Sequence, residues 1–255
     1  MRMRLGLVLV VGLLLGFVAG CGGPEKLTSK TLFPAVSKAQ AAAGSSHLSM
    51  QLTAPTGQTF RSHGEMKLGK HAEDTAMVMT VAGQGSGLGT IELRLVDRNF
   101  YMALGALTKG KFAKFDLTDQ SNPVSRQYGE IIKNVDPARQ MASYQDAITS
   151  FDSSGKTVEL DGVKTQPYAI TIDPKKAGTL KSFGANGQLP KKIRFTLYLG
   201  PDNLPRRMVS LVPGSAGDTR LQMDYTKWGE KVSIKAPSKS DIVDDSLFSQ
   251  LGKAS

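Results

Sequence analysis

The chain has 255 residues, and its 32 lysines and arginines outnumber its 22 acidic residues, so its formal net charge at pH 7 is +10. With a single cysteine the chain cannot form an internal disulfide, so a domain outside the cytoplasm must be stabilised by its core alone. The lysines are scattered, with no run of five, which argues against a nucleic-acid partner. We interpret them as a solvated basic surface, with attraction to anionic lipid head groups as the alternative.

Residues 1–20 have the pattern of a bacterial export signal. Arg2 and Arg4 supply a positive region, and residues 5–19 are apolar or glycine throughout. This run of about fifteen residues is shorter than the roughly 20 that a membrane-spanning helix needs, but it suits the core of a signal peptide. We therefore expect residues 1–20 to be removed as a signal peptide.

The segment Val18-Ala19-Gly20-Cys21 resembles the lipobox of bacterial lipoproteins. Small residues precede the expected cleavage site, and Cys21 is the only thiol that could carry diacylglycerol. We expect Cys21 to be lipidated, with palmitate among its acyl chains, and to anchor the chain to the outer face of the cell membrane. The alternative is a plain secretory signal with an incidental cysteine.

The chain after the signal has no break in composition that would divide it. Without the first 20 of its 255 residues it keeps 235, and losing Arg2 and Arg4 lowers its net charge to about +8. This length fits one sizeable domain. We expect a lipidated cysteine and flexible tether over residues 21–30, a single domain over 31–248 and a C-terminal tail over 249–255.

Three segments are predicted to be helical, near residues 32–43, 136–150 and 174–183. In the second, Asp136 can cap the helix and Pro137 suits its first turn. Met141, Tyr144 and Ile148 then follow at helical spacing, which would place them on one face. A further short helix-prone piece lies around residues 125–132.

Most of the remaining chain alternates between apolar and polar residues, as half-buried antiparallel strands do. In the clearest example, Ile193, Phe195 and Leu197 alternate with polar residues. The other expected strands cover residues 77–81, 91–95, 100–104, 113–117, 158–160, 168–172, 221–225 and 232–234. We expect an α+β fold with a large, curved antiparallel sheet of about ten or eleven strands and helices packed on its apolar face.

No pattern of catalytic residues stands out. The chain has no Gly-x-Ser-x-Gly segment and no Walker loop, and the glycine-rich residues 83–89 lack the following Lys-Ser/Thr. None of His47, His63 and His71 is four residues from another, as a zinc helix would require. Trp228 is expected to pack near the end of a late strand, with stacking on a ligand as the alternative. We expect no enzyme activity, no metal and no cofactor.

Several short segments resemble one family of lipoproteins. They are Leu204-Pro205-Arg206-Arg207-Met208, Tyr225-Thr226-Lys227-Trp228-Gly229, Ile234-Lys235-Ala236-Pro237 and Asp241-Ile242-Val243-Asp244. With the lipobox, helices and strands, they make residues 30–245 similar to the LppX/LprA/LprF/LprG lipoproteins of mycobacteria and other actinobacteria. The resemblance implies a half-barrel sheet like that of the LolA/LolB carriers. It also implies a lipid or glycolipid ligand, carriage within the cell envelope and a membrane lipid exporter as partner.

The expected inner face predicts which residues would line a lipid cavity. Methionine adapts to irregular apolar shapes, and several of the ten methionines fall on that face, although ordinary core filling remains the alternative. The predicted lining is Met77, Met79, Leu93, Leu95, Met141, Tyr144, Ile148, Phe195, Leu197 and Met223. A second hypothesis is a non-transporting envelope scaffold or sensor, in which side chains fill the same space.

The lipid anchor can be tested by changing the one thiol. The full chain with Cys21→Ala, expressed in an actinobacterial host, is expected to incorporate no radioactive palmitate, because no thiol remains to carry diacylglycerol. The variant should also partition differently from membranes. Labelling at the wild-type level would contradict the lipobox interpretation.

Overall fold

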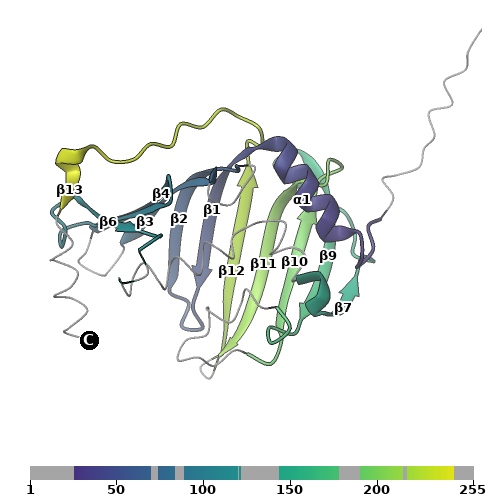
Figure 1. Ribbon diagram of the computed structural model, residues 1–255. Coiled ribbons are helices and arrows are strands. Elements are labelled where there is room, and N and C mark those ends of the chain that lie inside the picture. The colour runs from purple at the N-terminus through teal and green to yellow at the C-terminus, as the bar shows by residue number, and fades with distance from the viewer. Residues whose placement is uncertain are drawn as a thin grey trace, which may run out of the picture.

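The computed structural model describes residues 26–69, 74–83, 89–119, 121, 144–177, 190–214 and 217–243. One large curved antiparallel sheet dominates it, with helix α1 (Leu32–Ala43) lying across one end (Figure 1). The sheet has 13 strands, in the order β13-β6-β5-β4-β3-β2-β1-β12-β11-β10-β9-β7, and β8 pairs with β9 outside this path. The expected α+β half-barrel is confirmed, with more strands than predicted.

The strands follow one another along the chain with short connections. They are β1 (Ser45–Thr53), β2 (Thr59–Lys67), β3 (Ala76–Gly83), β4 (Gly89–Val96), β5 (Asn99–Leu104), β6 (Phe112–Asp116), β7 (Ile148–Asp152), β8 (Val158–Leu160), β9 (Val163–Ile172), β10 (Ile193–Leu199), β11 (Pro205–Gly214), β12 (Gly217–Thr226) and β13 (Ile242–Val243). Among these described strands, all pairs are antiparallel except the parallel pair of β13 with β6.

Helix α1 has the bounds that its sequence predicts. It ends because Gly44 adopts a φ of +74°, which favours glycine, and the Gly44 N–H donates to the Gln40 carbonyl at 3.0 Å. Its buried residues are Leu32, Phe33, Val36 and Gln40, which face the sheet.

The second predicted helix is wrong at its C-terminal end. Tyr144 to Ala147 are helical, but Ile148 begins β7 and pairs with Ile172 of β9. The β-branched pair Ile148-Thr149 suits a strand, and this tertiary pairing overrides the helical spacing. Residues 125–132 and 136–143 lie outside the described residues.

Two other predictions need correction or stay open. Residues 174–176 form a turn, and the rest of the third predicted helix, 178–183, lies outside the described residues. Residues 232–234 form no strand, because the chain leaves the sheet after β12 and crosses towards β13 along one edge (Figure 1).

The strand register places apolar side chains on one face of the sheet across its whole width. Phe100 faces Phe115 and Leu95, Leu95 faces Met77, and this pattern continues strand by strand to β9. Two cores lie on this inner face. The first joins α1 to β9 and β10 and contains Leu32, Phe33, Val36, Ala147, Tyr168, Ile170, Ile172, Ala177, Leu197 and Leu199. The second, on β4 to β6, contains Leu95, Phe100, Ala113, Phe115 and Leu117.

The C-terminal segment covers a smaller apolar cluster on the opposite face of β4 to β6. Ile234 and Ile242 pack there against Val96, Tyr101, Ala103 and Phe112. Arg94 holds this segment in place, since its Nη1 donates to the Lys235 carbonyl at 3.0 Å while its guanidinium carbon lies 4.9 Å from the Phe112 ring centroid.

This arrangement predicts that the segment contributes to stability. Ile234→Asp should lower the free energy of unfolding by about 1–3 kcal/mol, because it places a charge against the apolar cluster. The matched change Ser233→Asp, at the exposed neighbouring position, should have little effect. Urea unfolding of the two variants checks this, and equal midpoints would contradict the packing.

Candidate functional site

The inner face collects the residues that were predicted to line a cavity. Seven of them lie on it according to the strand register: Met77, Met79, Leu93, Leu95, Phe195, Leu197 and Met223. Tyr144 and Ile148 pack against the core beneath α1, and the Tyr144 ring centroid lies 6.1 Å from that of Phe33. Met141 lies outside the described residues. The structure therefore places the nine described residues at one face, and their contact with lipid stays a prediction.

These residues differ in how much of each is exposed. Leu95 and Leu197 are only 5% and 6% exposed and belong to the two cores, so they serve the fold. Between the cores the inner face is half-buried, on β11, β12, β1, β2 and β3. We call the half-buried methionines of this middle part the methionine band: Met50, Met66, Met79, Met208 and Met223.

The methionine band lies on adjacent strands. Met208 faces Met223, and Met223 faces Met50, so three thioether side chains cross β11, β12 and β1 in one row. No inward position of β1 or β2 carries a charge: these positions are Ser46, Leu48, Met50, Leu52, Phe60, Ser62, Gly64 and Met66. Such a surface suits flexible apolar chains, because methionine is unbranched and changes rotamer readily.

The opposite face of the same strands is polar. Arg207 of β11 forms an ion pair with Asp224 of β12, and Gln222 Nε2 donates to the same carboxylate at 2.8 Å. Arg220 Nη1 donates to Gln222 Oε1 at 2.9 Å. The sheet thus separates a charged, hydrogen-bonded face from an apolar one, as a half-wet antiparallel sheet does.

Sequence reasoning missed Met50 and Met66 because it did not predict β1 and β2. On β1 the alternation of Leu48, Met50 and Leu52 with polar residues is present and could have been found. On β2 the inward residues Ser62 and Gly64 are small and weaken the pattern.

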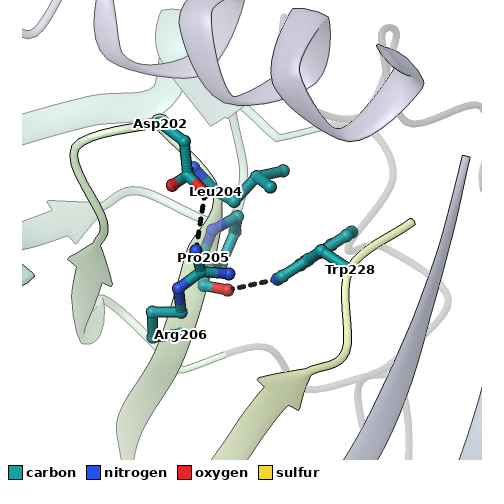
Figure 2. Close-up of polar contacts among 5 residues, drawn as sticks. All are labelled: Asp202, Leu204, Pro205, Arg206 and Trp228. Atoms are coloured by element: carbon teal, nitrogen blue, oxygen red, sulfur yellow. Dashed lines mark hydrogen bonds and ion pairs between the residues drawn. The ribbon is translucent and has the colours of Figure 1, made fainter. Parts of the chain in front are cut away.

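The segments that carried the family resemblance meet at one end of the sheet (Figure 2). The Trp228 indole N–H donates to the Pro205 carbonyl at 2.8 Å, which ties the chain after β12 to the start of β11. Arg206 Nη2 lies 2.6 Å from Asp202 Oδ2, and the Leu204 N–H donates to Asp202 Oδ1 at 3.1 Å. Trp228 therefore packs just after a late strand, as predicted.

Tyr225 connects this end of the sheet with the methionine band. Its ring stacks on that of Trp228, with the centroids 5.9 Å apart, and its hydroxyl donates to Met223 Sδ at 3.8 Å. Burial, followed by the nearby Tyr144 and Asp224, raises the pKa of the Tyr225 phenol to about 12. The neutral phenol is thus the form that the folded protein holds near neutral pH.

A pocket of about 350 Å³ lies apart from the methionine band. It is lined by Lys67, Asp74, Thr75, Ala76, Val96, Asp97, Ile234, Lys235 and Ala236, under the C-terminal segment. Its lining pairs two lysines with two aspartates, so it selects no charge. Across the described ranges, no cluster of three or more His, Cys, Asp or Glu residues could hold a metal. Within the same ranges, no helix is long and apolar enough to span a membrane.

The fold is that of a known mycobacterial lipoprotein. LprF from Mycobacterium bovis superposes with a TM-score of 0.54 at 15% identity, over 82% of this chain and 97% of that one. The MucA/MucB complex of Pseudomonas aeruginosa is a looser match, with a TM-score of 0.43 at 13% identity over 83% of this chain and 59% of that one. A LolA-superfamily protein from Nitrosomonas europaea reaches a TM-score of 0.33 at 9% identity, over 87% of this chain and 100% of that one.

The comparisons by sequence add no relative. No protein-family model matches the sequence, and curated proteins give no significant match. The predicted resemblance to the LppX/LprF-type lipoproteins is therefore confirmed at the level of the fold.

The raised pKa of Tyr225 predicts a pH dependence. The phenol ionises near pH 10 in the unfolded chain and near 12 in the folded protein, so its stabilising contribution is complete below pH 10 and is lost between pH 10 and about 12. The free energy of unfolding should fall more steeply over this window in the wild type than in Tyr225→Phe. Urea unfolding at several alkaline pH values measures both slopes, and parallel slopes would contradict the burial of Tyr225.

Proposed function

We propose that this chain is a lipid-anchored protein of the cell envelope that binds acyl chains of a lipid or glycolipid on the inner face of its sheet and carries them within the envelope. The observation that supports this most directly is the methionine band. It is apolar and half-buried, and it lies between two cores that are already closed. Soluble proteins seldom leave a broad apolar surface exposed unless it binds something.

The energetics of such binding are favourable. Each methylene moved from water to an apolar surface gains about 0.8 kcal/mol, so ten buried methylenes would gain about 8 kcal/mol before ordering costs. A net charge of +10 for the whole chain would draw the protein towards anionic head groups, an effect that salt should weaken.

The residues of the inner face support binding rather than catalysis. On β1, β2 and β12 its one titratable side chain among the described residues is Tyr225, whose high pKa keeps it neutral. A general acid or base would need a pKa close to the working pH. We therefore propose a carrier without enzymatic activity. In a scaffold, by contrast, side chains alone would cover the methionine band.

Two adjacent residues of β1 give a matched test. Met50 faces Met223 and Ser62 on the inner face, whereas Gln51 faces Gln222 and Arg61 on the opposite face, and both are half-buried. Met50→Glu should reduce the lipid that co-purifies with the full chain from an actinobacterial host by at least about tenfold, because a carboxylate would have to be desolvated beside the acyl chain. Gln51→Glu should leave the lipid content unchanged.

The measurement is lipid extracted per mole of protein, quantified by mass spectrometry, with circular dichroism melting as the control for folding. If Met50→Glu fails to fold, Met50→Gln supplies a neutral polar side chain of similar length. Wild-type lipid content in a folded Met50 variant would refute binding at the methionine band.

A further inference from the structure

One row of paired residues crosses the inner face from β9 to β5. In order across the sheet it consists of Tyr168, Leu197, Met208, Met223, Met50, Ser62, Val81, Ile91 and Leu104. Only Tyr168 and Ser62 in this row carry a polar side chain. The Tyr168 hydroxyl, at one end, accepts a hydrogen bond from the Leu27 N–H at 3.2 Å. Ser62 lies in the middle of the row, next to the methionine band.

The Ser62 hydroxyl is buried without a partner. Ser62 is 4% exposed, and its Oγ has neither solvent contact nor a hydrogen bond. Ser210, which also faces inward, shows the usual solution, since its hydroxyl donates to the Arg194 carbonyl at 3.2 Å. An unsatisfied buried hydroxyl destabilises a protein, so its presence in an apolar row calls for a function.

The surroundings of Ser62 can open without a change in the backbone. Its cross-strand neighbours Met50 and Val81 are half-buried, and the next inward position of β2 is Gly64. The Met79 thioether fills the space over Gly64, because a Cβ built on that glycine would lie 2.7 Å from Met79 Sδ. Flexible methionine side chains thus flank the hydroxyl, and they can move aside for a ligand.

We propose that the Ser62 hydroxyl donates a hydrogen bond to an oxygen of the bound lipid, and so selects acyl chains that carry an acceptor such as an ester carbonyl over plain alkyl chains. This inference rests on the proposed function, because it requires lipid on the methionine band. The bond would form where water is excluded, where a hydrogen bond is stronger than in water. It would also satisfy the one polar group of the row that has no partner.

A pair of soluble probes isolates this hydrogen bond. Dioctanoylglycerol carries two ester carbonyls, whereas di-O-octylglycerol has ether linkages and the same chain length. Binding of both is measured to the full chain in the same non-ionic detergent. The wild type should bind the diester about fivefold more tightly, the effect of one hydrogen bond. Ser62→Ala should bring the two affinities together by weakening the diester alone.

Ser46 supplies the matched control. Its hydroxyl is also buried without a partner, at 0% exposed, and it faces inward on β1. It lies four residues from Met50, roughly 13 Å along the strand, and so outside the row of Ser62. Ser46→Ala should keep the preference for the diester. Both variants should unfold at the wild-type temperature or slightly higher, because each removes an unsatisfied hydroxyl.

The outcomes separate this inference from the proposed function. Equal binding of the two probes to the wild type, or an unchanged preference in Ser62→Ala, would overturn the role of Ser62 while leaving acyl-chain binding intact. Loss of the preference in Ser46→Ala but not in Ser62→Ala would assign it to the wrong serine. If the wild type bound neither probe, lipid binding itself would fall, and this inference with it.

Discussion

The structure depends on one constraint: a large antiparallel sheet that alternates with a period of two gathers its apolar side chains on a single face, and that face must be covered. Helix α1 covers the part on β9 and β10, and a second core closes the part on β4 to β6. Among the described residues, the middle strands between these cores keep a half-buried apolar surface. That surface distinguishes a binding protein from a protein with a filled core.

The composition of this middle surface is consistent with its position. Methionines occupy it on five adjacent strands, whereas the two closed cores are built mainly from leucine, isoleucine and phenylalanine. Stiffer side chains specify a single packing, while methionine tolerates many, which is useful where a ligand enters and leaves. The polar network of Arg207, Gln222 and Asp224 on the opposite face keeps that side in water.

Much of this architecture could be predicted from alternation alone. The bounds of α1 and the inner faces of β3, β4, β10 and β12 follow directly from the sequence. The start of β7 does not, because the pairing of Ile148 with Ile172 is a long-range contact that local helical spacing cannot reveal. Alternation also identifies which face a side chain occupies but not what covers it. Leu95 and Leu197 were therefore grouped with the lining, although they belong to the cores.

The most direct test of the central claim is native mass spectrometry of the wild-type full chain, purified from an actinobacterial host in a mild detergent. The account predicts a second population whose mass exceeds that of the anchored protein by one lipid, released on collisional activation and identified as an acyl-chain lipid. A single population at the mass of the anchored protein alone, under conditions that preserve lipid complexes, would contradict it and favour the scaffold.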